Sequence, residues 1–159
     1  YSARFKLPMT AMLADLGVAV PEIVPAIAAW NDEIARREAP LARGAARLLR
    51  GLRERGQPGG VISAAALAVV EAETVRLGIR ADLGFVIGDA DPKSDPLRVL
   101  VGEAAGNVLY VGDTEYDMAE ATAAGAVPVG FAGGYRPAAA LLAAGALAVV
   151  DDLALLLPE

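Results

Sequence analysis

Short, unbroken apolar runs alternate with longer segments of mixed character from residue 58 to the end of the chain. The short runs predict five β-strands, at 59–63, 83–88, 107–112, 126–132 and 146–150. The segments behind them predict helices over 64–78, 95–106, 114–125, 136–145 and 151–157. Alternation of apolar strands with helices is typical of a parallel sheet that is covered on both faces. The pattern therefore predicts an α/β fold with a doubly wound parallel sheet.

The first 57 residues lack such runs, and their apolar residues recur at helical spacing. This spacing predicts helices over 9–17, 21–39 and 42–56. We expect the first two helices to pack together, away from the sheet, with Trp30 in their seam or facing the site. The third helix carries a face of five arginines, which we interpret as a solvated surface in preference to a phosphate-binding one.

The composition narrows the chemistry that the chain can perform. Its 159 residues, 55% of them hydrophobic, suffice for one domain with a sizeable core and a small appendage. The net charge of -6, without a basic stripe, argues against a nucleic-acid partner. The sequence has neither Cys nor His, which excludes thiol nucleophiles, His-based acid–base catalysis and most zinc sites. Any metal must be held by oxygen ligands, which points to Mg²⁺ or Ca²⁺.

The sequence shows no sign of a membrane partner. No apolar run reaches the ~18 residues that a membrane span requires, and no basic-then-apolar leader precedes the fold. We therefore expect a cytoplasmic protein. The chain begins with Tyr1 rather than Met, so we expect its native start to lie further upstream. Nothing in the sequence indicates an oligomeric state.

Polar side chains and glycines follow four of the predicted strands, at the point where each strand ends. They are Ser63 after the first strand, Asp89, Asp91, Lys93 and Asp95 after the second, Asp113, Thr114 and Asp117 after the third, and Gly133, Gly134 and Arg136 after the fourth. Ligands bind beyond the carboxyl ends of the strands in open parallel sheets. A hydroxyl, an ammonium and two carboxylates meet there, and this set suits a phosphate group with Mg²⁺.

Each of these residues also has a structural explanation. Ser63 taken alone is better explained as a helix N-cap, and Asp113 is open to the same explanation. We favour a metal site for Asp113 and Asp117 because Asp117 lies one helical turn further on, on the side that faces the strand ends. Lys93 is one of two lysines against twelve arginines, which indicates a need for a compact ammonium.

The order of these motifs resembles that of the haloacid dehalogenase superfamily of hydrolases, in particular its phosphoglycolate-phosphatase-like branch. "VISAA", which contains Ser63, resembles the second motif of the family. "PKSDP", which contains Lys93, resembles the third, with Ser94 in place of the usual proline. "VGDTEYDMAEATAAGA" (111–126) resembles the fourth motif closely. The resemblance implies a Rossmann-like core over 41–159, with residues 1–40 as an incomplete helical cap.

The resemblance also implies a function. It implies a Mg²⁺-dependent phosphatase that cleaves a small phosphorylated metabolite, a monoester similar to phosphoglycolate, through an aspartyl-phosphate. Asp113 would ligate Mg²⁺ directly and Asp117 would assist. Lys93 would bind both the nucleophile and the phosphate, Ser63 would bind a phosphate oxygen, and Thr114 would contact the substrate.

The nucleophile motif of that family, Asp-x-Asp-Gly-Thr on the first strand of the core, is missing. No aspartate precedes residue 15, so we expect the nucleophile upstream of Tyr1 and the chain as given to be inactive. "IGDAD" (87–91) imitates the motif, but no Gly-Thr follows Asp91 and the loop already belongs to Lys93. A non-catalytic binding or scaffold module is the alternative. A 2-haloacid dehalogenase is a further one, disfavoured because its reaction needs no metal.

Overall fold

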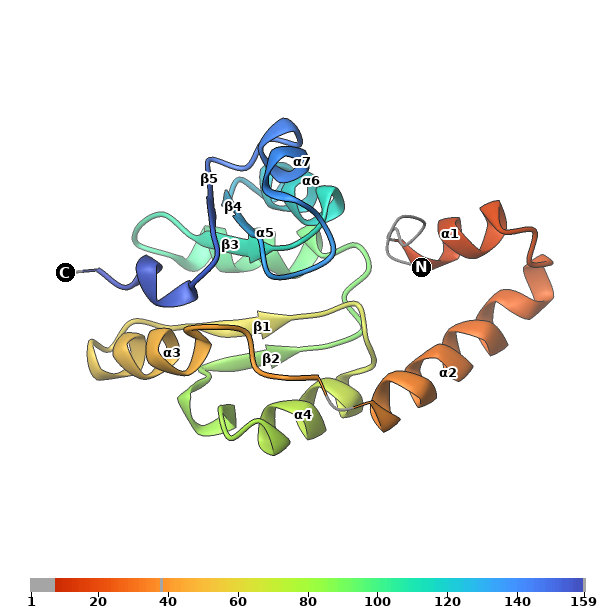
Figure 1. Cartoon of the computed structure of the whole chain (residues 1–159), viewed down its shortest axis with the longest axis horizontal. Helices are drawn as coiled ribbons and strands as arrows, with labels where there is room; N and C mark the ends of the chain where they lie inside the picture. Colours follow the sequence, from red (N-terminus) through yellow and green to blue (C-terminus); the bar gives the residue numbers. More distant parts are fainter. Residues whose placement is uncertain (1–7, 38, 159) are drawn as a thin grey trace.

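Figure 1 shows the computed structural model, which describes residues 8–37 and 39–158. Its strands are β1 (Gly60–Ile62), β2 (Phe85–Ile87), β3 (Leu109–Gly112), β4 (Val127–Phe131) and β5 (Ala148–Val150). Each strand lies inside one of the apolar runs, and each contains β-branched or aromatic residues that suit an extended, covered backbone. All strand pairs are parallel, so the predicted α/β fold class is confirmed.

Helices follow the strands as the sequence pattern predicts. They are α1 (Met9–Asp15), α2 (Val20–Arg36), α3 (Ala45–Glu54), α4 (Leu67–Arg76), α5 (Ser94–Glu103), α6 (Glu115–Ala124) and α7 (Ala138–Ala143), with 3-10 turns η2 (Arg80–Asp82) and η3 (Leu153–Leu156). The predicted α-helix over 151–157 is wrong in type, because this segment forms only the short turn η3. The few hydrogen bonds that these residues could form before Pro158 do not offset the backbone entropy that is lost when an α-helix starts.

The sheet consists of two parts, which lie one above the other in Figure 1. β1 pairs with β2, while β3, β4 and β5 pair in that order. Among the described residues, β1 and β3 each pair along one edge only. No residue of β1 or β2 is fully buried, although strands inside a doubly wound sheet normally are. The parallel sheet predicted from the sequence is therefore divided, with β1 and β3 at the inner edges.

The buried core belongs mainly to the three-stranded part. One cluster of buried side chains lies around α5, α6 and β3, and a second lies around α6, α7 and the approach to β5. Their members are Leu97, Tyr110, Ala121, Ala124 and Ala126 in the first and Met118, Leu141 and Ala146 in the second. The small alanine side chains let α6 approach the strands closely, which places its first turn directly beyond the end of β3.

α1 and α2 pack against each other beside the sheet, as predicted (Figure 1). Met9 and Met12 of α1 are buried against Ile27 and Trp30 of α2, so Trp30 lies in the seam between the two helices. α2 also reaches the start of α4, where Asn31 Oδ1 accepts a backbone hydrogen bond at 3.3 Å. The division into a cap and a core at residue 40 stays a prediction. No helix in the described part of the chain is both long and apolar enough to span a bilayer.

Candidate active site

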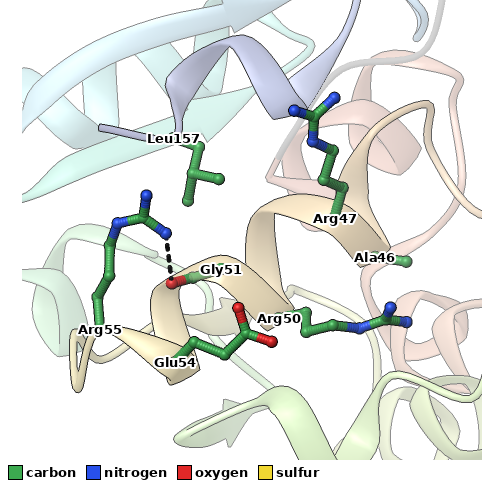
Figure 2. A pocket seen from close by; sticks show the side chains of 7 residues that line it. All are labelled: Ala46, Arg47, Arg50, Gly51, Glu54, Arg55 and Leu157. Atoms are coloured by element: carbon green, nitrogen blue, oxygen red, sulfur yellow. Dashed lines mark hydrogen bonds between the residues drawn. The ribbon is translucent and has the colours of Figure 1, made fainter. Parts of the chain in front are cut away.

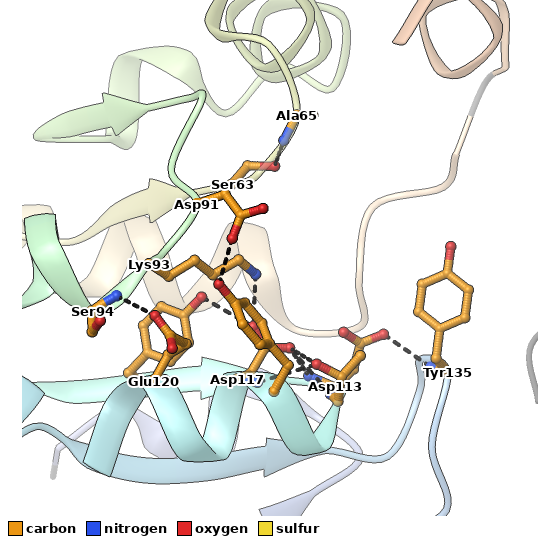
Figure 3. Close-up of polar contacts among 12 residues, drawn as sticks. Ser63, Ala65, Asp91, Lys93, Ser94, Asp113, Asp117, Glu120 and Tyr135 are labelled. Atoms are coloured by element: carbon orange, nitrogen blue, oxygen red, sulfur yellow. Dashed lines mark hydrogen bonds and ion pairs between the residues drawn. The ribbon is translucent and has the colours of Figure 1, made fainter. Parts of the chain in front are cut away.

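A buried ion pair between Lys93 and Asp117 lies at the centre of the candidate site (Figure 3). Lys93 Nζ is 2.7 Å from Asp117 Oδ1, and the side chains of Lys93 and Asp117 are only 11% and 3% exposed to solvent, respectively. Lys93 immediately precedes α5 and Asp117 lies in the first turn of α6, so the pair joins the segments that follow β2 and β3. Charges removed from water persist only when paired in this way. The structure thus brings the lysine loop and the acidic turn into contact, while the roles of these residues stay predictions.

The second oxygen of Asp117 is held by the turn between β3 and α6. Asp117 Oδ2 accepts hydrogen bonds from the Thr114 hydroxyl at 2.6 Å, from Thr114 N at 3.1 Å and from Asp113 N at 3.3 Å. A metal bound directly by Asp117 would therefore have to displace existing donors. The structure gives Asp117 contacts that orient Lys93 and the turn, and its predicted role at the metal stays a prediction.

Thr114 is the N-cap of α6. Its hydroxyl donates to Asp117 Oδ2 and accepts from Asp117 N at 3.2 Å, which completes a capping box. The side chain is also buried. The substrate contact predicted for Thr114 would require this cap to break, because the hydroxyl is already used inside the turn.

Tyr110, which the sequence analysis did not single out, completes the surroundings of Asp117. Its hydroxyl donates to Asp117 Oδ1 at 3.3 Å. Burial and then the charge of Asp117 raise the pKa of the Tyr110 hydroxyl, so it remains a donor at neutral pH. Tyr110 shares a face of β3 with Gly112, where any Cβ would collide with Asp117. A tyrosine two residues before a glycine, in an otherwise aliphatic strand, is the signal that would have found it.

Asp113 is the carboxylate that remains half-exposed at this edge. Its Oδ2 accepts a hydrogen bond from Tyr135 N at 2.9 Å, in the loop after β4 (Figure 3). Burial raises the pKa of the Asp113 carboxyl; the Tyr135 hydrogen bond and Lys93 oppose the shift, and Asp117 adds to it. The loop can come this close because Gly134 has no side chain, and a Cβ there would overlap the Asp113 carboxylate.

Ser63 lies at the end of β1, in the other part of the sheet (Figure 3). Its backbone N–H donates to Ile87 O at 2.9 Å and its carbonyl accepts from Ala90 N at 3.0 Å, which fixes it to the end of β2. Ser63 Oγ accepts from Ala65 N at 3.1 Å, and its O–H is left able to donate. Among the described residues no hydrogen bond joins it to Lys93, although both follow strands of the same part of the sheet.

Both aspartates of the segment that imitates a nucleophile motif have structural partners. Asp89 Oδ2 accepts from Leu67 N at 3.0 Å and so caps the start of α4. The backbone of Asp89 is left-handed, with φ of 53°, a conformation that aspartate tolerates better than most residues. Asp91 Oδ1 accepts from the Tyr116 hydroxyl at 2.8 Å. These contacts support the interpretation of both residues as parts of the lysine loop.

The donors at this edge fit a small divalent cation in part. Asp113 offers a carboxylate oxygen, which is the ligand type that Mg²⁺ prefers. Within residues 8–37 and 39–158, no three acidic side chains gather closely enough to hold a metal ion. Asp113 alone does not make a metal site, and further ligands would have to come from water, from a bound substrate or from other residues.

A hollow of about 400 Å³ lies elsewhere, on α3 (Figure 2). Its lining combines three arginines with one acid and small or apolar residues: Ala46, Arg47, Arg50, Gly51, Glu54, Arg55 and Leu157. Figure 2 shows the three guanidinium groups pointing apart, and Arg55 already donates to Gly51 O at 3.2 Å and Pro158 O at 3.1 Å. This divergence favours the solvated face that the sequence analysis preferred.

Comparisons with solved structures identify proteins of the same fold. A predicted phosphatase from Clostridium acetobutylicum superposes with a TM-score of 0.79 at 19% identity, over 94% of this chain and 74% of the other. A haloacid dehalogenase-like hydrolase from Streptococcus pneumoniae gives 0.74 at 19% identity, over 93% and 74%. A predicted phosphoglycolate phosphatase from Haemophilus somnus gives 0.71 at 19% identity, over 94% and 72%. At such identities the likeness shows the fold alone.

The sequence itself was compared with curated proteins and with family models. No curated protein matched. The model of the family described as haloacid dehalogenase-like hydrolase matches residues 1–131, which include Ser63, Lys93 and the whole acidic turn after β3. Because this match spans most of the chain and the solved relatives share its fold, the chain belongs to the haloacid dehalogenase-like hydrolases.

Proposed function

We propose that the intact protein is a Mg²⁺-dependent phosphatase that hydrolyses a small phosphate monoester of the phosphoglycolate type. The proposal rests on the buried Lys93–Asp117 pair, which fixes an ammonium beside the half-exposed carboxylate of Asp113 at the carboxyl edge of the sheet. Membership of the hydrolase family supports the reaction class. The relatives from Clostridium acetobutylicum and Haemophilus somnus, a predicted phosphatase and a predicted phosphoglycolate phosphatase, support a phosphatase and the phosphoglycolate class.

Lys93 binds the phosphoryl group in this proposal. A lysine ammonium has three N–H donors, and the described contacts use one of them, for Asp117. The remaining donors can bind a phosphoryl oxygen and the attacking carboxylate. A cation that is already fixed and partly desolvated stabilises charge in the transition state without reorganising. Asp117 contributes indirectly, because its ion pair fixes the position of the Lys93 ammonium.

Ser63 binds a second phosphoryl oxygen from the opposite side. Its carbonyl and N–H are tied to the end of β2, and its O–H is left to donate. A phosphate group held between the end of β1 and the end of β3 would therefore meet a hydroxyl on one side and an ammonium on the other. This placement makes use of both parts of the divided sheet.

Asp113 holds the cation. Mg²⁺, when bound, offsets the negative charge of the phosphate group. Burial raises the pKa of Asp113, which means that its surroundings offset the negative charge of the ionised carboxylate poorly. An added cation would therefore stabilise this carboxylate more than it would stabilise an exposed one. Tyr135 N holds one carboxylate oxygen, which leaves the other for the metal.

The nucleophile is an aspartate upstream of residue 1 in the intact protein, on a strand between β1 and β3. Within residues 8–37 and 39–158 the inner edges of these two strands have no partner, and this observation and the incomplete burial of β1 and β2 support such a strand. Its carboxylate would attack phosphorus between Ser63 and Lys93, forming an aspartyl-phosphate as the alcohol leaves. Water would then cleave the acyl phosphate and release inorganic phosphate.

The test compares the 159-residue chain with the protein that includes the residues encoded upstream. Both are assayed with Mg²⁺ on p-nitrophenyl phosphate and phosphoglycolate. We expect turnover from the longer protein and essentially none from the shorter chain, because removal of a nucleophile costs on the order of 10⁶ in kcat in enzymes that depend on one.

Other results would select a different function. Ordinary turnover by the short chain would make a residue such as Asp89 the nucleophile and would contradict the proposal. An inert longer protein across a broad set of phosphate esters would favour the non-catalytic binding module. Metal-independent release of halide from a 2-haloacid would favour the dehalogenase.

A further inference from the structure

Tyr116 makes two contacts with the segment that carries Lys93. Its hydroxyl donates to Asp91 Oδ1 at 2.8 Å, and the centre of its ring lies 6.0 Å from Lys93 Nζ. Tyr116 belongs to the first turn of α6, next to Asp117, while Asp91 lies two residues before Lys93. The lysine loop is therefore joined to α6 through this tyrosine as well as through the ion pair.

A second contact matters because a lysine side chain is long and flexible. Its ammonium ends a four-carbon stem, and holding it still costs rotamer entropy of about 2 kcal/mol. The ion pair fixes the distance of Lys93 Nζ from Asp117, but one contact does not fix its direction. The face of an aromatic ring attracts an ammonium and restricts it from a further side.

The hydroxyl of Tyr116 acts on the loop rather than on the ammonium. Asp91 and Lys93 lie in the stretch between β2 and α5, which has no regular structure to hold it. Burial and then the hydrogen bond to Asp91 raise the pKa of the Tyr116 hydroxyl, so it stays protonated and donates at neutral pH. The hydrogen bond thus anchors the loop two residues before Lys93.

We propose that Tyr116, with Asp91 as its partner, is a positioning residue that sets where the Lys93 ammonium stands when a phosphate group binds. The identity of the ligand rests on the function proposed above. The contacts of Tyr116 do not, because both are made to residues of the chain itself. Tyr116 therefore acts through Lys93 and not on the reacting atoms.

The lysine content of the chain provides a direct readout. Lys6 and Lys93 are its only lysines, so a Lys6→Arg background leaves Lys93 as the single lysine in an NMR spectrum of ¹³C-lysine-labelled protein. The ring of Tyr116 should displace the Hε resonances of Lys93 upfield. We expect Tyr116→Leu to remove this displacement and Tyr116→Phe, which keeps the ring, to retain most of it.

The second readout is the affinity for inorganic phosphate, followed by the same Lys93 resonances in the 159-residue chain. Tyr116→Phe removes the hydroxyl that donates to Asp91 and keeps the ring, and we expect it to weaken phosphate binding about three- to tenfold. Thr122→Ala is the matched control, because it removes a hydroxyl that bonds only within α6, to Met118 O at 2.9 Å. The control should leave both the affinity and the Lys93 resonances unchanged.

A double-mutant cycle separates the contact from changes in charge. Asp91→Ala removes a negative charge near the anion and so alters phosphate affinity by itself. If the hydrogen bond between Tyr116 and Asp91 supports phosphate binding, Tyr116→Phe should change the phosphate affinity little in the Asp91→Ala background. An equal loss of affinity in both backgrounds, or no loss in either, would overturn the role of Tyr116. Unfolding curves of each variant confirm that folded proteins are compared.

The two proposals fail in different ways. If phosphate leaves the Lys93 resonances of the parent chain unchanged, Ser63 and Lys93 do not form a phosphate site without the upstream strand. The inference about Tyr116 is then decided by the resonances alone: it stands if Tyr116→Leu moves them, and it falls if they keep their positions. If phosphate binds equally well to the parent chain and to Tyr116→Phe, the site stands and the positioning role is wrong.

Discussion

At the scale of single residues, Asp117 shows how one buried carboxylate can organise a site. Lys93 and Tyr110 hold one of its oxygens, and the turn before α6 holds the other. Each of these groups would lose its hydrogen bond or ion pair with Asp117 if the carboxylate were removed. The cost of such a loss is large because the groups lie out of reach of water.

We therefore expect Asp117→Ala to lower the free energy of unfolding by about 3 kcal/mol or more at neutral pH, as broken buried ion pairs do. Urea denaturation followed by circular dichroism measures it. Asp95→Ala is the matched control, because its pair with Arg98 is exposed and such pairs contribute about 1 kcal/mol at most. Similar losses for the two variants would mean that the Asp117 network is not closed in solution.

Asp113 leads to a prediction about pH, because its carboxyl pKa is raised in the folded state. The folded protein then binds the proton more tightly than the unfolded chain, whose aspartates titrate near ~3.9. The resulting stabilisation is present below that unfolded value and is lost as pH rises through the folded pKa. Asp113→Asn cannot ionise, so without metal it should melt at a higher temperature than the parent at pH 7.

This gain in melting temperature should shrink as the pH falls through the pKa of Asp113 in the folded protein, toward its lower pKa in the unfolded chain. Differential scanning calorimetry in the presence of a chelator, from pH 7 down to acid, measures it. Asp95→Asn controls for the loss of one negative charge on an exposed side chain. An Asp113→Asn protein that is less stable than the parent at pH 7 would contradict the raised pKa.

At the scale of elements, loops that touch the acidic turn depend on glycines. A Cβ on Gly134 would overlap the carboxylate of Asp113, so the loop after β4 would have to move away. We expect Gly134→Ala to break the hydrogen bond from Tyr135 N and to weaken the stabilisation of the chain by Mg²⁺. Thermal melting with and without Mg²⁺ measures this, since a ligand that binds the folded state raises the melting temperature.

Gly106→Ala serves as the control for this loop, because a Cβ there meets nothing within 4 Å. It should melt within a degree or two of the parent and should respond to Mg²⁺ as the parent does, as expected for a surface change of this size. If Gly134→Ala responds to Mg²⁺ as the parent does, the proposal that Asp113 binds the metal is contradicted.

Elements with strong periodicity could be predicted from the sequence. Each strand falls inside its apolar run, because three to five consecutive residues without a charged side chain give a clear signal. Ser63, Lys93, Asp113 and Asp117 were found because residues after parallel strands share one edge of the sheet. Tyr110 and the partnership of Tyr116 with Asp91 were not predicted, because such contacts depend on side-chain directions and loop closure that no spacing encodes.

At the scale of the whole molecule, the division of the sheet is the feature that matters most. The sequence pattern predicts which segments are strands but not which edges pair, since pairing depends on residues far apart in the chain. The structure leaves β1 and β3 unpaired on their inner sides among the described residues. An upstream strand would join the part of the sheet that Ser63 and Lys93 follow to the part that Asp113 follows, and would complete the site.

The most direct test of the central claim is Mg²⁺-dependent release of phosphate from phosphoglycolate by the intact protein and by its Asp113→Asn variant. We predict turnover by the parent that disappears when Mg²⁺ is chelated, and loss of this Mg²⁺-dependent turnover in Asp113→Asn, because the carboxylate proposed to hold the cation is gone. Release of phosphate that is equally fast in the variant, or equally fast without Mg²⁺, would contradict the account.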